Sequence, residues 1–271
     1  MNTNLLKRTL TCILGIPVLA ALIFLIPQHH FLGLSVLMFI CSLLGSLEMS
    51  KMLFGKVTLI SGITWILPLL QYLYGSSDTA TALLLVICSL AEIINTQNGN
   101  FENSINNFAK NVLLVIYPSF LATFVIKVLT LPFCNSHLVM FFLLLVFSND
   151  IFAYVFGMLF GKTNAGIIKV SPKKSIAGFV GGFVSCIVIC LLYSKIFTGN
   201  LPYMNIAKQI TLAALMSITA NIGDLAESII KRGAKVKDSG NIIPGRGGIL
   251  DSMDSILTSA PLFCFFLEKA L

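Results

Sequence analysis

Charged residues are scarce in this chain of 271 amino acids. Asp, Glu, Lys and Arg together make up 11% of the sequence, hydrophobic residues make up 56%, and the mean hydropathy is +0.92. So few charged side chains cannot cover the surface of a water-soluble globule of this size. The composition therefore excludes a soluble domain and predicts a protein that resides in a lipid bilayer.

The chain also lacks the cysteine and histidine patterns of disulfide frameworks and zinc sites. It has seven cysteines but no CxxC pair, and only Cys134 lies near a predicted loop, so we interpret the cysteines as packing residues. His29, His30 and His137 lie at the ends of apolar runs on the predicted outer side. This placement argues against a zinc ligand or a general base.

Alternation of apolar and polar residues with a period of two is absent, which excludes transmembrane β-strands. Apolar runs of about 20 residues, the length that a membrane-spanning helix needs, recur between short polar connectors. We predict an all-α, polytopic helical bundle of about nine transmembrane helices. Pro17 and the lack of a cleavage pattern favour a retained first helix over a signal peptide. The predicted helices cover 10–27, 31–49, 58–75, 79–94, 111–131, 137–160, 178–196, 206–226 and 252–268.

Basic residues are distributed unequally between the two sides of this predicted bundle. The N-terminus and the even-numbered loops hold 14 of the 18 Lys and Arg residues, the opposite side holds three, and Lys127 lies within a span. Because cytoplasmic loops of membrane proteins collect Lys and Arg, the side with 14 is predicted to be cytoplasmic.

Two polar segments, 148–182 and 221–255, interrupt the hydrophobic pattern. Together they hold six of the 11 acidic residues. Carboxylates within or beside a membrane span are costly, so they usually face a polar cavity and serve function. We therefore divide the chain into N-terminal transmembrane helices, 1–135, and a C-terminal transmembrane region with cytoplasmic loops, 136–271, that carries the candidate catalytic site.

The acidic residues of the second segment follow helical spacing. Asp224 and Glu227 lie about one turn apart, and Asp251 and Asp254 repeat this spacing on the next predicted helix. The loop between them is rich in basic residues and in glycine, which allows close approach to the backbone. Carboxylates for a hard cation, beside bases and backbone amides for phosphate, are what a magnesium-triphosphate site requires. The alternative is a helical hairpin whose charges pair with one another.

The sequence GMLFGKT at 157–163 has only a partial likeness to a phosphate-binding loop. It has three residues between its glycines rather than four, and it ends an apolar helix instead of following a strand. We interpret Gly157 with Gly161, and Gly178 with Gly182, as helix-packing positions. Asp150 shares a helical face with Gly157 and can thus reach a common cavity. A structural aspartate bonded to neighbouring helices is the alternative.

A long series of small, basic and acidic residues in the second segment carries a family resemblance. The series consists of Ser228, Lys231, Arg232, Lys237, Asp238, Ser239, Gly240, Pro244, Gly245, Gly247, Gly248, Asp251 and Asp254. It closely resembles the signature of the phosphatidate cytidylyltransferases, or CDP-diacylglycerol synthases. The first segment is similar to an aspartate-containing helix and a Ser-Pro-x-Lys loop of the same family, through Asp150, Tyr154, Ser171, Pro172, Lys174 and Ser175. The resemblance covers about the C-terminal half of the chain.

The resemblance implies an enzyme that transfers a cytidylyl group from CTP to phosphatidate, forming CDP-diacylglycerol and releasing pyrophosphate. It implies Mg²⁺, with a second cation as a further expectation, held by Asp224, Asp251 and Asp254, and Asp150 is an additional candidate ligand. The residues implied to act in catalysis are Lys231, Arg232, Lys237, Asp238 and Arg246. Those implied to bind substrate are Ser171, Lys174, Ser228, Gly245, Gly247 and Gly248.

The resemblance also sets expectations for the surroundings of the site. We expect CTP, phosphatidate and membrane lipid as partners, no nucleic acid, and a homodimeric assembly. We expect the chain to be integral to a bacterial inner (plasma) membrane, with its active site facing the cytoplasm. Arg246 stands where the family usually has His, and Ser252 where it usually has Arg. A histidine base is not required, because the attacking lipid phosphate is already ionised at neutral pH.

Three rival functions fit the sequence less well. A CDP-alcohol phosphotransferase needs a DGxxAR pattern, whereas Asp251 is followed by Ser252. A CTP-dependent lipid kinase matches the Lys-Asp-Ser-Gly and Pro-Gly series less fully. An ion-coupled transporter using Asp150 and Asp224 would not need a long, basic, glycine-rich cytoplasmic loop, and the chain has no clear inverted repeat.

Overall fold

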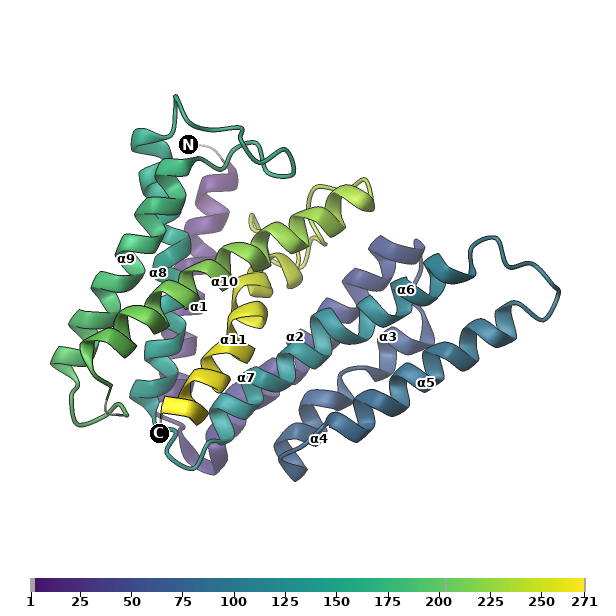
Figure 1. Cartoon of the computed structure of the whole chain (residues 1–271), viewed down its shortest axis with the longest axis horizontal. Helices are drawn as coiled ribbons and strands as arrows, with labels where there is room; N and C mark the ends of the chain where they lie inside the picture. The colour runs from purple at the N-terminus through teal and green to yellow at the C-terminus, as the bar shows by residue number, and fades with distance from the viewer. Residues whose placement is uncertain (1–2, 203, 271) are drawn as a thin grey trace.

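The computed structural model describes residues 3–202 and 204–270, and these ranges are helical without a β-strand (Figure 1). The elements are α1 (Thr3–Phe24), α2 (Gln28–Phe54), α3 (Leu59–Ile63), α4 (Ile66–Tyr74), α5 (Asp78–Asn95), α6 (Ser104–Val115), η1 (Ile116–Phe120), α7 (Leu121–Thr130), α8 (Ser136–Phe160), α9 (Ile176–Ile196), α10 (Ile206–Gly233) and α11 (Leu250–Ala270). The all-α prediction is confirmed, and each of the nine predicted segments falls on helical structure.

The prediction of one continuous helix over 58–75 was wrong. The chain forms α3 and α4 there, with a break at Thr64 and Trp65. Pro68 explains the break, because a proline ring collides with the carbonyl group four residues earlier, here that of Thr64. Pro68 lies instead in the first turn of α4, where a missing N–H is tolerated.

A second proline shapes the helix predicted over 111–131, which is built from α6, η1 and α7. The π-helical turn η1 surrounds Pro118, and Leu121 N–H bonds to the carbonyl oxygen of Ile116, five residues earlier. The wider turn accommodates the proline without ending the helix.

Six helical segments of the described part are long and apolar enough to cross a membrane, so the count of nine spans is not confirmed. These segments are Gln28–Phe54, Asp78–Asn95, Ser104–Thr130, Ser136–Phe160, Ile176–Ile196 and Leu250–Lys269. The apolar parts Gly15–Phe24 and Leu59–Tyr74 are shorter, and α10 is too polar to qualify. Long apolar helices with outward-facing aliphatic side chains identify an integral membrane protein.

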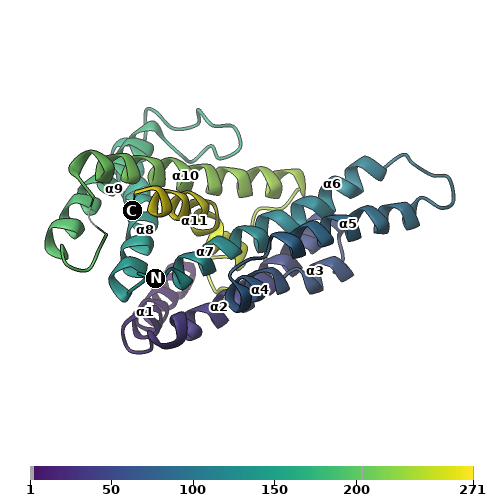
Figure 2. The ribbon, with the colours of Figure 1, turned by 60° about the horizontal axis from the view of Figure 1, so that its bottom comes forward.

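The C-terminal helix α11 holds the bundle together. It contacts α10, α8, α7 and α2, whereas α5 and α6 form a hairpin that extends away from the other helices (Figures 1 and 2). Helices α8 and α9 run side by side, and α10 crosses them. Contacts of α11 with α2 and α7 thus join the predicted regions 1–135 and 136–271. The assignment of catalysis to the second region stays a prediction.

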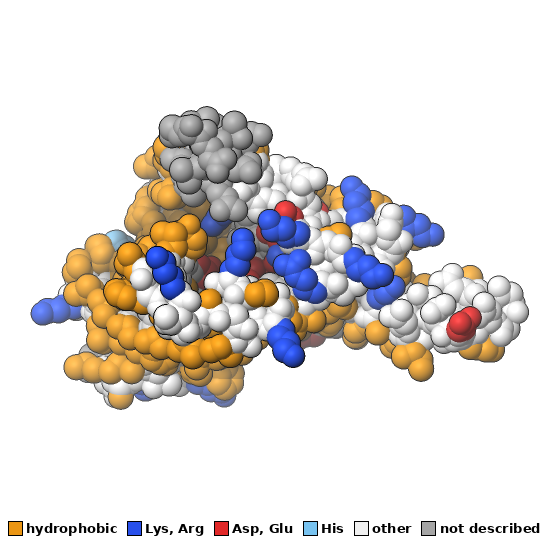
Figure 3. Space-filling view, turned by 90° about the horizontal axis from the view of Figure 1, so that it is seen from above, with side chains coloured by type: hydrophobic (Ala, Val, Ile, Leu, Met, Phe, Trp, Pro, Cys, Tyr) orange, Lys and Arg blue, Asp and Glu red, His pale blue; other side chains and the backbone are white. Residues whose placement is uncertain are grey.

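One end of the bundle is strongly charged. Figure 3 shows Lys and Arg side chains gathered around a hollow in which acidic side chains are visible. The polar segments between α8 and α9 and between α10 and α11 are rich in Lys and Arg and lie at this end.

Candidate active site

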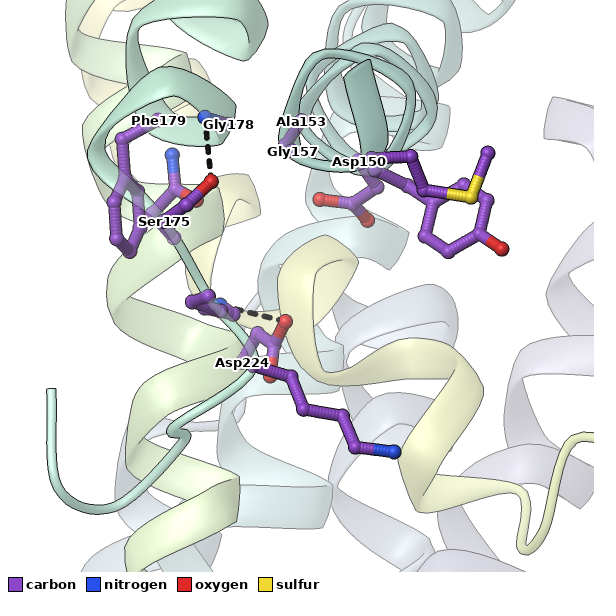
Figure 4. Close-up of a pocket in the computed structure, with 12 residues that line it drawn as sticks. Asp150, Ala153, Gly157, Ser175, Gly178, Phe179 and Asp224 are labelled. Atoms are coloured by element: carbon purple, nitrogen blue, oxygen red, sulfur yellow. Dashed lines mark hydrogen bonds and ion pairs between the residues drawn. The ribbon is translucent and has the colours of Figure 1, made fainter. Parts of the chain in front are cut away.

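A cavity of about 430 Å³ lies among α8, α9 and α10, at the segment that joins α8 to α9 (Figure 4). Its wall combines acidic and basic groups with the apolar surfaces of Tyr154, Met158 and Phe179, which suits an amphiphilic ligand. The lining residues are Asp150, Ala153, Tyr154, Gly157, Met158, Lys173, Lys174, Ser175, Gly178, Phe179, Asn221 and Asp224.

An ion pair between the α8–α9 segment and α10 lies at this cavity. Lys174 Nζ is 2.7 Å from Asp224 Oδ2, and the two side chains are 21% and 38% exposed. Ser228 Oγ donates to Asp224 Oδ1 at 3.5 Å. Because the pair is only partly buried, a phosphate can compete for Lys174 and a cation for Asp224.

Asp150 faces the same cavity from α8 and is exposed to it. Its Oδ1 accepts a hydrogen bond from Nδ2 of the fully buried Asn149 at 3.2 Å. Asn149 Oδ1 in turn accepts from Ser217 Oγ at 2.6 Å and from Asn221 Nδ2 at 3.2 Å, which ties α8 to α10. Asn149 therefore positions Asp150, and sequence reasoning missed it although it is a polar residue within an apolar span.

Lys231 lies between two acidic side chains near the end of α10. Its Nζ donates to Glu227 Oε2 at 2.6 Å and to Asp251 Oδ1 at 2.5 Å. Burial alone would lower the pKa of Lys231, but Glu227 and Asp251 outweigh burial and raise the pKa above its ordinary value. Glu227 Oε1 is buried and has no hydrogen-bond partner among the described residues. Lys231 therefore keeps its positive charge and links α10 to α11 through its ion pairs with Glu227 and Asp251.

Asp251 organises the loop that precedes α11. Its Oδ2 accepts hydrogen bonds from Ser239 N, Ser239 Oγ and Gly248 N, each at 2.8 Å. Gly247 has φ +110°, and a Cβ there would lie 2.5 Å from Asp251 Oδ2, so this position requires glycine. Since Lys231 Nζ bonds to the other oxygen, a cation bound to Oδ1 of Asp251 would have to lie beside the ammonium group of Lys231.

A tight turn presents the basic tip of this loop. Arg246 N donates to Ile243 O at 3.1 Å, and Gly245 has φ +79° after Pro244, the geometry of a type II turn. Arg246 is exposed at the tip, as is Lys237 near the start of the loop.

A residue of the N-terminal half, Glu48 on α2, also binds this loop. Glu48 is 6% exposed. Its Oε1 accepts from Ile249 N at 3.0 Å, and its Oε2 accepts from Leu250 N and from Ser239 Oγ, both at 3.1 Å. Sequence reasoning missed Glu48, whose only signal was a carboxylate inside the predicted span 31–49.

The acidic residues carry more negative charge than their basic partners neutralise. Asp150, Asp224 and Glu227 lie close enough to the buried Asp254 to repel its charge. Among the described residues, neither Asp150 nor Asp254 has an ion-pair partner. No three described His, Cys, Asp or Glu side chains form a ready-made metal cage. The surplus charge nevertheless fits Mg²⁺, which uses one or two carboxylates together with substrate phosphates.

The structure brings together only part of the predicted site. Asp150, Lys174 and Asp224 line the cavity, while Ser171 lies in a turn outside its lining. The group beside α11 consists of the buried residues Ser228, Lys231 and Asp254 and the half-buried Asp251. Exposed positions are held by Arg232, Lys237, Asp238 and Arg246. The glycines of the loop, Gly245, Gly247 and Gly248, flank Arg246 and precede Asp251 along the chain.

Comparison with known proteins places the chain in a family. Residues 6–270 match the sequence profile of the Cytidylyltransferase family. The chain belongs to this family. It is 28% identical over 261 residues to the phosphatidate cytidylyltransferase of Bacillus subtilis. This alignment covers 92% of this chain and 94% of that protein.

Other relatives of the family align over shorter regions. The phosphatidate cytidylyltransferase of Haemophilus influenzae is 34% identical over 178 residues, 62% of each chain. The uncharacterized protein YnbB of Escherichia coli is 37% identical over 131 residues, 48% of this chain and 42% of that protein. The chain thus spans about half the length of several curated relatives that it matches.

Close helix packing frames the cavity of this cytidylyltransferase-family member. A Cβ at Gly178 would lie 2.7 Å from Ala153 O, one at Gly182 would lie 2.8 Å from Asn149 O, and one at Gly161 would lie 2.6 Å from Ser175 Oγ. The interpretation of these glycines as packing positions is therefore confirmed. Their small size lets α8 and α9 approach closely on one side of the cavity.

Proposed function

We propose that this protein is a phosphatidate cytidylyltransferase, which converts CTP and phosphatidate to CDP-diacylglycerol and pyrophosphate. The observation that carries the proposal is the cavity with Asp150, Asp224 and Lys174 among apolar helices. A water-soluble nucleotide and a lipid must meet in this reaction, and a charged cavity at one end of a membrane bundle is reachable by both. Membership of the Cytidylyltransferase family supports it.

In the proposed reaction, a phosphate oxygen of phosphatidate attacks the α-phosphorus of CTP. A new P–O bond forms, the bond between the α-phosphorus and the oxygen bridging to the β-phosphate breaks, and that oxygen leaves with pyrophosphate. The attacking oxygen is already ionised, so catalysis consists mainly of positioning and charge neutralisation. Lys174 supplies positive charge at the cavity, and Lys231 holds α10 and α11 together beside it.

Asp224 and Asp254 are the residues that would hold Mg²⁺, with Asp150 as a third ligand and Asp251 as a further candidate. When bound, Mg²⁺ would neutralise phosphate charge, and a second cation would add to this effect. Tyr154, Met158 and Phe179 would contact the glycerol end of the lipid, whose acyl chains remain in the bilayer.

Activity of the purified protein tests the proposal. With phosphatidate in mixed micelles, CTP labelled at the α-phosphate and Mg²⁺, we expect labelled CDP-diacylglycerol and equimolar pyrophosphate. Omission of phosphatidate should remove both products. Release of labelled CDP with phosphorylation of the lipid, and without pyrophosphate, would point to the rival lipid kinase. A CDP-alcohol phosphotransferase would form neither product, because its donor is a CDP-alcohol rather than CTP. The native mass in detergent tests the proposed homodimer.

The proposed orientation in a bacterial inner membrane places the charged end in the cytoplasm, as the basic residues favour. Single cysteines at Lys173 and Lys235, both exposed, in a cysteine-free background should react with a membrane-impermeant maleimide in inside-out vesicles but not in intact spheroplasts. A cysteine at Lys208, at the other end of α10, should show the opposite pattern. Labelling of all three from one side would contradict this topology.

Arg246 is proposed to contact phosphate without transferring a proton. Arginine stays charged at any working pH and offers a fork of donors that fits phosphate. We expect Arg246→Lys to keep part of the activity with a raised KM for CTP, and Arg246→Ala to lose about tenfold or more in kcat/KM. Arg232→Ala, at another exposed arginine, provides a comparison within the same surface. Wild-type kinetics of Arg246→Ala at limiting CTP and at limiting phosphatidate would remove Arg246 from the site.

A further inference from the structure

Among the described residues, the carboxylate of Glu48 has no ion-pair partner, and it instead binds the backbone of the C-terminal loop. Its two oxygens accept from the N–H groups of Ile249 and Leu250, the residues at which α11 begins. These N–H groups lie at a helix start, where no intrahelical carbonyl is available to them. Glu48 therefore caps α11 from a different helix, and the positive end of the helix dipole stabilises its buried charge.

Ser239 links Glu48 to the second carboxylate that holds the loop. Its hydroxyl lies 3.1 Å from Glu48 Oε2 and 2.8 Å from Asp251 Oδ2. A hydroxyl has one proton, so the two carboxylates share one donor and are kept close by it. The loop between α10 and α11 is thus fixed at Ser239 and again at the start of α11.

The glycines of the loop fit Glu48 closely. A Cβ at Gly240 would collide with the Glu48 carboxylate, and a Cβ at Gly248 would collide with Ser239 Oγ and then with Glu48 Oε2. A side chain at Gly240 would therefore displace the carboxylate, and one at Gly248 would disturb both the carboxylate and the hydroxyl bonded to it. The sequence pattern suggested that these glycines make room for phosphate, whereas the structure gives Gly240 and Gly248 the role of admitting Glu48.

We infer that Glu48 is a positioning residue of the active site, which fixes the loop carrying Lys237 and Arg246 in the conformation that binds the CTP phosphates. This inference rests on the proposed function. Glu48 itself contacts the loop through the N–H groups of Ile249 and Leu250 and through the hydroxyl of Ser239, and it acts through these groups. The N-terminal helices therefore contribute to the site through α2.

Glu48→Gln tests the inference, because glutamine keeps the shape of the side chain but replaces one acceptor oxygen with an NH₂ group. One backbone N–H then loses its acceptor and faces another donor. We expect the KM for CTP to rise about tenfold, as for loss of a hydrogen bond to a charged group, while the KM for phosphatidate stays within about twofold. Hydrogen exchange in peptides covering 237–250 should become about tenfold faster, while peptides from α8 and α9 keep their wild-type rates.

Glu92→Gln is the matched control. Glu92 is also a buried glutamate of the N-terminal half, 8% exposed, but it lies in α5 and faces a groove lined by 89–108. We expect this variant to leave both the kinetics and the exchange of 237–250 unchanged. Gly240→Ala should reproduce the Glu48→Gln phenotype, because the atoms nearest to a Cβ at Gly240 all belong to Glu48.

The two measurements separate failure of this inference from failure of the proposed function. Unchanged exchange of 237–250 in Glu48→Gln would overturn the anchoring. Faster exchange with an unchanged KM for CTP would show that the anchor positions nothing used by CTP, and would overturn the inference as well. Absence of CDP-diacylglycerol from the wild-type assay would overturn the proposed function, whereas hydrogen exchange would still decide whether Glu48 holds the loop.

Discussion

Replacement of Lys231 by methionine is expected to abolish activity and to destabilise the protein. Lys231 is the ion-pair partner of Glu227 and Asp251, whose side chains are 1% and 8% exposed. Methionine has a similar length but no charge, so two buried carboxylates would face each other without a cation. Loss of one partner from a buried ion pair costs about 3–5 kcal/mol. The thermal midpoint in detergent and the rate of CDP-diacylglycerol formation are the measurements.

Lys127→Met is the control for this prediction. Lys127 is paired with Glu268 at 2.6 Å, but these side chains are 36% and 42% exposed, and an exposed pair contributes about 0–1 kcal/mol. The double variant Lys231→Met with Glu227→Gln should regain part of the lost stability, because it removes one unpaired acid. If Lys231→Met has the same thermal midpoint as wild type, the ion pairs of Lys231 with Glu227 and Asp251 are not needed for stability.

The helices were largely predictable because lipid imposes a simple requirement. Each spanning segment needs an apolar surface and internally bonded backbone, so hydropathy alone places helices. The break between α3 and α4 was not predicted, although its cause, Pro68, is visible in the sequence. Hydropathy averaged over a span does not detect the break, because Thr64 and Trp65 are only two residues within an apolar run. The number of spans was less predictable, since α10 combines helical spacing with many polar residues.

The candidate site was predictable where its residues are close in sequence. The acids and bases of α10, the loop and α11 belong to one segment, and helical spacing brings Glu227 and Lys231 together. Contacts between distant segments were not accessible to such reasoning. Glu48 meets Leu250 across 202 positions of the chain. Asn149 meets Ser217 across 68 positions. Both were nevertheless marked by a polar side chain within an apolar span, the pattern that most often indicates function in membrane helices.

Asp254→Asn is expected to lower turnover by roughly two orders of magnitude or more, because a bound metal contributes several kcal/mol of charge stabilisation. Asp254 is buried on α11 beside Asp224 and Glu227, and among the described residues it has no ion-pair partner. Asparagine keeps the size of the side chain but removes one negative charge. The helix should therefore survive while affinity for Mg²⁺ falls. Turnover across a magnesium titration is the first measurement.

Stability provides a second measurement that does not depend on activity. Mg²⁺ should raise the thermal midpoint of the wild-type protein, since a ligand that binds only the folded state stabilises it, and should raise that of Asp254→Asn much less. Asp78→Asn, an exposed aspartate in the first turn of α5, should keep the response of wild type. Asp224→Asn should behave like Asp254→Asn, although it also releases Lys174. Near-normal turnover of correctly inserted Asp254→Asn at every magnesium concentration would show that the buried carboxylates serve packing between α10 and α11 rather than metal binding.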